Sequence, residues 1–378
     1  MFAIRPNISL GVISDRYAKI YGSEAMCIIS EHPYNFELFE IDRINPDVLL
    51  RLENLAEFHK PLSDYLPNVY GIISTESLRL LKLLMEQSNL YINNLPECLT
   101  QPKANISGFL EGKKYPYFMG IVNVTPDSFS DGGKNYTIGN AIATAGEMLN
   151  NNVDIIDIGG ESTRPGAEKV SEEEELERVI PVIEGIKSTY PDAVISIDTY
   201  KSKVAEAALK SGAAIVNDIS GGTFETSMFD VVSSFDCYYI LMHTLGEPAT
   251  MQHNPVYNNV VIEVLSALLR QAKKASEAGI KNIILDPGIG FGKTIAHNWE
   301  IIARLEEFTQ VKFPILMGVS RKSMLSLVTD LPADKRDFSS GFVEMACLIN
   351  GASIIRTHDY KKIRELKKTY KALTLLND

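Results

Sequence analysis

Polar side chains that can bind or react stand at the ends of eight short apolar runs in the C-terminal two thirds of the sequence. They are Asn123, Asp157 followed by Glu161, Asp198, Asn217 with Asp218, His243, Asp286, Ser320 with Arg321 and Lys322, and Arg356 with His358. One polar residue after an apolar run is ordinary, because loops are polar, but solvation alone does not explain eight of them. We therefore expect these run ends to meet at one site, and the chain to be an enzyme.

These residues fall into two chemical classes. The acceptors Asp198, Asn217 and Asp286 suit a flat heterocycle with an amino-pyrimidinone edge, because a carboxylate can accept a pair of ring N–H groups. The donors suit a multiply charged oxyanion such as a phosphate, and they are Asn123, Arg164, Lys322, Arg356 and His358. We expect a pocket that binds a polar ring at one side and an anionic tail at the other.

The apolar runs read as buried strands, and helix-like stretches separate them. The expected strands are Phe118–Asn123, Val153–Gly159, Ala193–Asp198, Ala213–Asp218, Tyr238–His243, Asn282–Asp286, Pro314–Val319 and Ala352–Thr357. The expected helices are Ile138–Asn150, Glu172–Thr189, Ser202–Ser211, Val260–Ala278, Asn298–Phe308 and Lys361–Thr374. Strands that alternate with helices pair in parallel through right-handed crossovers. Eight such units predict an α/β fold, a (β/α)8 TIM barrel whose strands meet at their C-terminal ends on one face.

An open, doubly wound sheet is the alternative arrangement. That fold should have a glycine-rich turn after its first strand, whereas this sequence has Thr125-Pro126-Asp127 there. A polar, glycine-tipped loop, Ser128–Gly133, follows. A buried strand that delivers the amide of Asn123 into a polar loop suits the mouth of a barrel, although on spacing alone it could also be a strand before an ordinary turn.

Residues 1–112 read as a separate, small α/β domain, and residues 113–378 as the barrel domain. The expected strands of the first domain are Ile8–Ser14, Ala25–Ser30, Asn35–Ile41 and Asn68–Ser74, and its expected helices are Pro46–Phe58 and Glu76–Gln87. The stretch Asn93–Lys114 contains prolines and glycines typical of a linker. No catalytic constellation is evident in this domain, and a role in packing or assembly is the simplest expectation.

Composition excludes several classes of partner. A net charge of −11 argues against nucleic acid or an anionic membrane as the main partner of the 378-residue chain. The four cysteines lie far apart and form no C-x-x-C pair, which predicts reduced thiols in a cytoplasmic protein. No apolar run is long enough to span a bilayer, and the N-terminus lacks a signal-peptide pattern.

Two motifs look functional but have simpler explanations. Gly288–Thr294 resembles a phosphate-binding P-loop, but Pro287 stands where that motif needs glycine. The acidic run Glu172–Glu175 follows Ser171 and reads as a capping box on a solvated helix. No spacing of His, Asp and Glu indicates a metal site made by protein alone. Mg²⁺ held mainly by substrate phosphates fits better, because Mg²⁺ keeps its waters and needs few protein ligands.

Several motifs together resemble those of the dihydropteroate synthase family over residues 115–378. They are Met119–Gly133, Asp157–Gly166, Ile195–Thr199, Asn217–Gly221, Asp286–Lys293, Ser320–Ser323 and Arg356-Thr357-His358. The resemblance implies condensation of 6-hydroxymethyl-7,8-dihydropterin pyrophosphate with para-aminobenzoate, which yields 7,8-dihydropteroate and pyrophosphate in folate biosynthesis. It also implies an SN1-like displacement, a sulfonamide target and a homodimer. The segments Thr244–Gly246 and Arg336–Gly341 depart from the family pattern but remove no expected ligand.

The resemblance also assigns roles to individual residues. Asp198, Asn217, Asp286 and Lys322 would bind the pterin ring. Asn123, Thr163, Arg164, Arg356 and His358 would bind pyrophosphate, with Mg²⁺ also at Asn123. Phe129, Pro165 and Ser323 would border para-aminobenzoate. Asp131, Arg164 and Lys322 would act in catalysis, and the loops that carry Asp131 and Arg164 would close over the site.

Two other functions stay open on the sequence. A corrinoid-dependent pterin-binding methyltransferase domain shares the barrel and the ring-binding acids, but it should lack the Ser320–Lys322 and Arg356–His358 anion groups. A non-catalytic pterin-binding or assembly protein is the second alternative, with the N-terminal domain as its active part.

Overall fold

The structure is a computed structural model that describes residues 36–40, 69–74, 116–125, 134–162, 169–246, 251, 255–309, 311 and 313–375. The chain divides into two compact units, built chiefly from Met1–Lys103 and from Ala104–Leu305 with Phe313–Asp378. In the first unit, β1 (Phe36–Glu40) pairs antiparallel with β2 (Val69–Ser74), which confirms two expected strands. The other elements expected before residue 112, and the boundary at that residue, lie outside the described residues.

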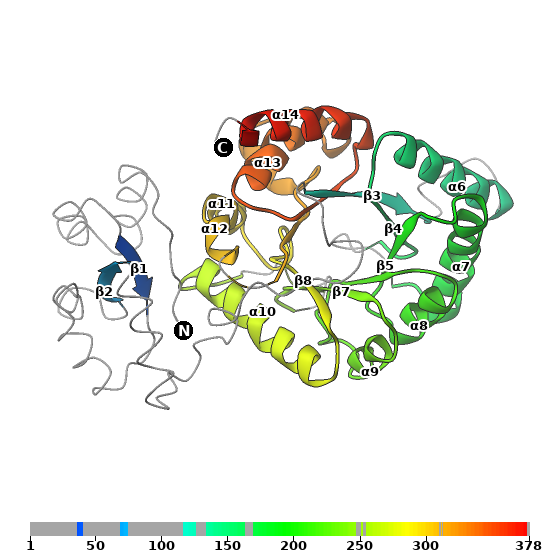
Figure 1. The fold of residues 1–378 in the computed structure, drawn as a ribbon, viewed down its shortest axis with the longest axis horizontal. Helices are drawn as coiled ribbons and strands as arrows, with labels where there is room; N and C mark the ends of the chain where they lie inside the picture. The colour runs from blue at the N-terminus through cyan, green and yellow to red at the C-terminus, as the bar shows by residue number, and fades with distance from the viewer. Residues whose placement is uncertain are drawn as a thin grey trace. The chain divides into compact units, whose positions relative to one another are not determined.

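Eight parallel strands form the barrel of the second unit. They are β3 (Tyr117–Asn123), β4 (Ile155–Gly159), β5 (Val194–Asp198), β6 (Ile215–Asp218), β7 (Tyr238–Met242), β8 (Asn282–Asp286), β9 (Leu316–Met317) and β10 (Ile354–Thr357). Their order in the sheet is β8-β7-β6-β5-β4-β3-β10-β9, and a parallel bridge between Leu285 and Ile315 joins the two ends. Figure 1 looks into this barrel. All eight expected strands and the TIM-barrel fold are confirmed.

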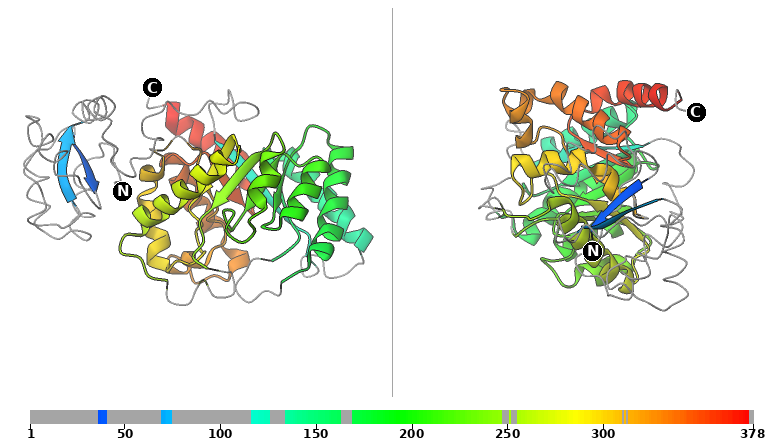
Figure 2. Two further views of the ribbon diagram at one scale, coloured as in Figure 1. Left: turned by 90° about the horizontal axis from the view of Figure 1, so that it is seen from below. Right: turned by 90° about the vertical axis from the view of Figure 1, so that its left-hand side faces the viewer.

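Helices alternate with the strands and lie around the outside of the barrel (Figures 1 and 2). They are α6 (Lys134–Asn150), α7 (Glu172–Thr189), α8 (Ser202–Lys210), α9 (Met228–Ser233), α10 (Val260–Glu277), α11 (Ile295–Ala303), α12 (Leu305–Phe308), α13 (Asp337–Ile349) and α14 (Ile363–Leu375). The helix expected over Asn298–Phe308 is interrupted at Arg304, whose side chain is buried. The sequence did not predict α9 and α13.

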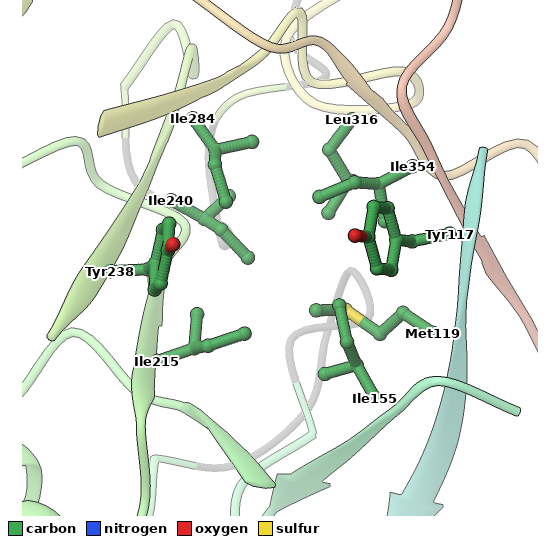
Figure 3. Packing of buried hydrophobic residues seen from close by; sticks show 9 residues of the cluster. All are labelled: Tyr117, Met119, Ile155, Ile215, Tyr238, Ile240, Ile284, Leu316 and Ile354. Carbon is green, nitrogen blue, oxygen red and sulfur yellow. The ribbon is translucent and has the colours of Figure 1, made fainter. Parts of the chain in front are cut away.

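Apolar side chains at alternate strand positions fill the interior of the barrel. The cluster comprises Tyr117, Met119, Ile155, Ile215, Tyr238, Ile240, Ile284, Leu316 and Ile354 (Figure 3). Side chains alternate along a strand with a period of two, so the residue two positions further on points into the same interior, nearer the C-terminal end. In β4, β6, β8 and β10 that residue is Asp157, Asn217, Asp286 and Arg356. The apolar cluster is therefore the floor beneath a polar layer.

Helix α7 begins as predicted, but its acidic first turn is not wholly solvated. Ser171 Oγ accepts from Glu174 N at 3.2 Å, as an N-cap should. Glu174 Oε1 pairs with Arg178 on the next turn. Glu175 is buried and pairs with Lys201 Nζ at 2.5 Å, so the expectation of a solvated face is wrong at this residue. The partner lies on another element, which a local sequence pattern does not reveal.

None of the described helices is both long enough and apolar enough to span a bilayer.

Candidate active site

A pocket lies at the C-terminal ends of the strands and brings together most of the predicted site residues that the structure describes. Its polar lining consists of Asp198, Asn217, Asp286, Ser320, Lys322, Arg356 and His358. Its apolar lining includes Ile121, Ile219, Met242, Ile289 and Phe291. The three predicted acceptors and three of the five predicted donors, Lys322, Arg356 and His358, thus line one cavity.

The three predicted ring-binding acceptors come from three strands and are each held by a neighbour. Asp286 is buried, and its Oδ1 accepts from Gly288 N at 2.7 Å. Asn217 Nδ2 donates to Asp157 Oδ2 at 3.1 Å. Asp198 Oδ2 accepts from Arg356 Nη2 at 2.6 Å. Each side chain is therefore oriented by the protein and leaves a further oxygen for a ligand.

Burial controls the ionisation of Asp198 and Asp286, the two carboxyl groups predicted to bind a ring. It raises the pKa of Asp198 to about 7, against the opposing charge of Arg356, and the charge of Asp157 adds to the rise. Burial also raises the pKa of Asp286, although its bond from Gly288 N and the charge of Lys322 oppose the rise. Both groups therefore hold their negative charge less readily than an exposed carboxylate, and a cationic ligand would restore it.

Arg356 makes two ion pairs from one guanidinium group. Its Nε donates to Asp157 Oδ2 at 2.6 Å, and its Nη2 donates to Asp198. Burial alone would lower the pKa of Arg356, but Asp157 and Asp198 raise it above the ordinary value. Arg356, which was predicted to bind an anion, therefore carries a permanent charge and also contacts Asp198, which was predicted to bind the ring.

Lys322 lies over an aromatic ring of the pocket lining. Its Nζ stands 4.4 Å from the centre of the Phe291 ring, a distance typical of a cation–π contact. Gly290 has φ +84°, and a Cβ there would stand 3.2 Å from Lys322 Cδ, so glycine gives the lysine stem its space. Lys322 directly precedes the short 3-10 helix η3 (Ser323–Leu327).

His358 is oriented by Ser320. Ser320 Oγ lies 3.1 Å from His358 Nδ1 and accepts from His358 N at 3.2 Å. Ser320 Oγ is 3.5 Å from Thr357 Oγ1, which donates to the buried Glu344 at 2.8 Å. The imidazole is thus held at one nitrogen while the residue lines the pocket.

Asn123 and Ser323 lie beside the pocket rather than in its lining. Asn123 ends β3, and its Oδ1 is 3.8 Å from the point where a Cβ on Gly159 would stand. Asp198 Cβ is 3.6 Å from the same point, so Gly159 separates the two residues. Ser323 is exposed at the start of η3, next to Lys322. The predicted residues Phe129, Asp131, Thr163, Arg164 and Pro165 lie outside the described residues.

The site also contains residues to which the sequence assigned no role. Asp157 Oδ2 accepts hydrogen bonds from both Asn217 and Arg356. Ile219, Met242, Met251 and Phe291 pack into an apolar cluster with Tyr200, which gives a ring an apolar wall. Asp157 was visible in the sequence as a charged residue within an apolar run, whereas the apolar wall had no signal, because apolar residues are expected in any core.

Lys293 supports the glycine-rich loop after β8 instead of binding phosphate. Its buried Nζ bonds to Gly288 O at 3.0 Å, Phe291 O at 2.9 Å and His243 Nδ1 at 3.0 Å. Burial lowers the pKa of Lys293 to about 7. Burial, with the charge of Lys293, lowers the pKa of His243 to about 2. The sequence was right to reject a P-loop here, since this lysine is turned into the protein.

Within the described part of the chain, no group of three or more His, Cys, Asp or Glu side chains could hold a metal ion. Among the predicted residues, the amide of Asn123 lies across Gly159 from Asp198 and offers a neutral oxygen beside the pocket. This donor set suits a hard cation that keeps most of its water or takes oxygens from a ligand.

Comparisons with known proteins agree with this arrangement. The family described as pterin binding enzyme matches residues 119–358. The dihydropteroate synthase of Bacillus subtilis is 44% identical over 276 residues, which are 72% of this chain and 92% of that protein. A Yersinia pestis dihydropteroate synthase solved with a sulfonamide drug complex aligns with a TM-score of 0.65 and 40% identity, covering 69% of this chain and 94% of that one. A Xanthomonas albilineans dihydropteroate synthase solved with 4-aminobenzoic acid gives a TM-score of 0.65 and 37% identity over the same shares.

Proposed function

Because the chain belongs to the dihydropteroate synthases of the pterin-binding enzyme family, we propose that its barrel condenses 6-hydroxymethyl-7,8-dihydropterin pyrophosphate with para-aminobenzoate. The products are 7,8-dihydropteroate and pyrophosphate. This assignment of roles is supported by the shared pocket, whose lining includes Asp198, Asn217 and Asp286 together with Lys322, Arg356 and His358.

The pterin ring binds in the half of the pocket that holds the acceptors. Its 2-amino-4-oxo edge has adjacent N–H donors, which the oxygens of Asp198, Asn217 and Asp286 can accept. Lys322 donates to an acceptor at the other side of the ring. Met242 and Phe291 supply apolar surface for the ring faces, as small-molecule sites commonly do.

The pyrophosphate binds in the cationic half and carries Mg²⁺. Arg356, His358 and the backbone near Ser323 bind its oxygens, and Asn123 would provide an oxygen ligand to Mg²⁺. The lack of a protein metal cage among the described residues supports a cation that arrives with the phosphates. When bound, Mg²⁺ neutralises charge on the leaving group. Thr163 and Arg164 contribute to the same subsite from the loop after β4.

The reaction proceeds by departure of pyrophosphate before attack of the amine. The C–O bond at the pterin methylene breaks with its electron pair going to the pyrophosphate oxygen, and the amine nitrogen then attacks the cationic methylene and releases a proton. Carboxylates around the ring stabilise the positive charge that develops on the pterin. Lys322, Arg356 and His358 stabilise the negative charge that develops on the departing pyrophosphate. A general base is not needed, because the aniline nitrogen attacks through its neutral lone pair.

Para-aminobenzoate binds at the rim near Ser323, with Phe129 and Pro165 as further contacts. The solved relative with 4-aminobenzoic acid supports this class of substrate. Asp131 and Arg164 order the loops that carry them, and these loops keep water from the cation. The exposed position of Ser323, beside the pocket-lining Lys322, suits a second substrate that enters after the pterin.

The protein works as a cytoplasmic homodimer. Exposed apolar residues at the end of η3, directly after it and on α13 support a subunit contact, and they include Leu327, Val328, Phe338, Phe342 and Ile349. The rings of Phe338 and Phe342 pack edge to face with their centres 4.9 Å apart. Buried free thiols at Cys237 and Cys347 fit a reducing compartment.

The direct test is an activity assay on the purified full chain with the pterin pyrophosphate, para-aminobenzoate and Mg²⁺. We expect equal amounts of 7,8-dihydropteroate and pyrophosphate, and no dihydropteroate when para-aminobenzoate is left out. Pterin binding without any condensation would instead favour a non-catalytic pterin-binding protein.

A further inference from the structure

Asp157 is a buried carboxylate of the polar layer that does not itself line the ligand pocket. It lies on β4 with a fully buried side chain, directly above Ile155 of the apolar floor. It is absent from the residues that line the pocket, whereas Asn217 and Arg356 are present there. Any effect of Asp157 on a ligand must therefore act through these two neighbours.

One oxygen of Asp157 binds two residues that have opposite roles in the pocket. Asp157 Oδ2 accepts from Asn217 Nδ2 at 3.1 Å and from Arg356 Nε at 2.6 Å. An ionised carboxylate can only accept, so the side-chain amide of Asn217 must turn its NH₂ group toward Asp157. The carbonyl oxygen of Asn217 then remains for the ligand.

Arg356 is fixed in the same way. Its Nε is bound to Asp157 and its Nη2 to Asp198, so two donors of one rigid plane are anchored. This anchoring sets the direction of the remaining guanidinium N–H groups. It also keeps a positive charge beside Asp198, which limits the rise in the pKa of that carboxyl group.

A purely stabilising role would not require a charge at this position. Buried ion pairs seldom stabilise a fold more than apolar residues of similar volume, because desolvation offsets the Coulomb attraction. Asp157 follows Ile155 on the inward face of β4, where apolar packing is available. The carboxylate is better explained by what it does to its neighbours.

We propose that Asp157 is a positioning residue that sets the ring specificity of the site, an inference that rests on the proposed function. By holding Asn217 as an acceptor, it leaves Asp198, Asn217 and Asp286 all able to accept hydrogen bonds from N–H donors of the ring. A pterin, with its 2-amino group, meets this pattern. A 2,4-dioxo analogue presents a carbonyl oxygen in place of the amino group. That oxygen needs a hydrogen-bond donor but would face an accepting oxygen of the protein, so the site rejects the analogue.

The test compares the binding of 6-hydroxymethyl-7,8-dihydropterin and its 2,4-dioxo analogue to wild type and Asp157→Asn by calorimetry. An amide at position 157 can donate or accept, so Asn217 becomes free to turn. We expect the preference for the pterin to fall by about tenfold or more, mainly through weaker pterin binding. In an Asn217→Ala background the same substitution should leave the preference unchanged, because the group it acts through is gone.

The matched control is Asp154→Asn, at the residue that directly precedes β4. Asp154 Oδ2 accepts from Phe118 N at 2.9 Å and from Lys367 Nζ at 2.7 Å, away from the pocket lining. This variant should keep the wild-type preference. Should Asp157→Asn fail to fold, the test becomes a measurement of hydrogen exchange at the Asn217 side-chain NH₂ group in the wild type. We expect slow exchange both with and without pterin, because Asp157 holds that group. Fast exchange would overturn the proposal.

Two further results would separate the possible failures. Equal weakening for both ligands in Asp157→Asn, or a changed preference in the Asn217→Ala background, would overturn the positioning role alone. Wild-type protein that binds neither ligand would refute the proposed function and this inference together.

Discussion

Replacing Asp286 with asparagine should uncouple ring binding from tail binding. Asp286 is buried at the end of β8, and its Oδ1 is occupied by Gly288 N at 2.7 Å. The other oxygen is therefore the one that faces a ring donor. In Asp286→Asn the amide oxygen can keep the bond from Gly288 N, so the turn is retained. The NH₂ group then points at the ring, where it meets N–H donors.

The size of the effect follows from the bonds that are lost. A hydrogen bond to a charged group contributes about 1.5 to 3 kcal/mol, and the pocket-facing oxygen can accept up to two ring N–H groups. A loss of about 3 kcal/mol corresponds to a rise in Kd of about 150-fold for 6-hydroxymethyl-7,8-dihydropterin. The affinity for inorganic pyrophosphate should stay equal or increase, because Lys322 and Arg356 lose a neighbouring negative charge.

Calorimetric titration with each ligand measures both affinities, and thermal unfolding checks the fold. Asp334→Asn is the matched control, since that carboxylate is largely exposed. A rise in Kd of less than about threefold for the pterin would show that Asp286 does not contribute a charged acceptor to the ring. Equal losses for pterin and pyrophosphate would refute the division of the pocket into two halves.

Three further predictions concern pH, backbone geometry and metal. Binding of 6-hydroxymethyl-7,8-dihydropterin, which lacks titrating phosphates, should strengthen as pH rises through about 7. Asp198 loses a proton there and then accepts hydrogen bonds with both oxygens. Calorimetry should find no such pH-dependent step in Asp198→Asn. Gly288→Ala should lower the free energy of unfolding, measured in denaturant, by about 3 kcal/mol or more. The reason is that Gly288 has φ +70° and a Cβ there would stand 1.9 Å from His243 O. Gly139→Ala is the control and should change the free energy of unfolding little, because no atom lies near its Cβ. Chelation of Mg²⁺ should weaken binding of the pterin pyrophosphate but not of the free hydroxymethylpterin, and equal weakening of both would remove Mg²⁺ from the tail subsite.

The sequence predicted the barrel well because its strands are short apolar runs with clear ends. Each of the eight expected strands is present, and α7 has the predicted bounds. Helix α13 was missed because its first turns contain Ser339, Ser340 and Gly341, which form helices poorly. Burial of Val343, Cys347 and Leu348 against the barrel stabilises it instead, and such tertiary packing leaves little local signal.

The site was predicted in its composition but not in its connections. Polar residues at strand ends identified Asp198, Asn217, Asp286 and Lys322 as members of one pocket. That Arg356 would bind Asp157 and Asp198 could not be read from the chain, because these partners are 199 and 158 residues away. The same holds for Glu175, whose buried partner Lys201 lies 26 residues further on. Long-range ion pairs depend on the closed barrel, which brings distant strands together.

The central claim is that this pocket separates charge, with carboxylates around a cationic ring and cations around a departing pyrophosphate. The most direct test is the secondary isotope effect on kcat/KM when the pterin methylene carries deuterium in place of hydrogen. Loss of pyrophosphate before attack makes that carbon planar in the transition state, so we predict a clear normal effect. An effect close to unity would mean that the amine attacks while the leaving group is still bonded, and it would contradict this account.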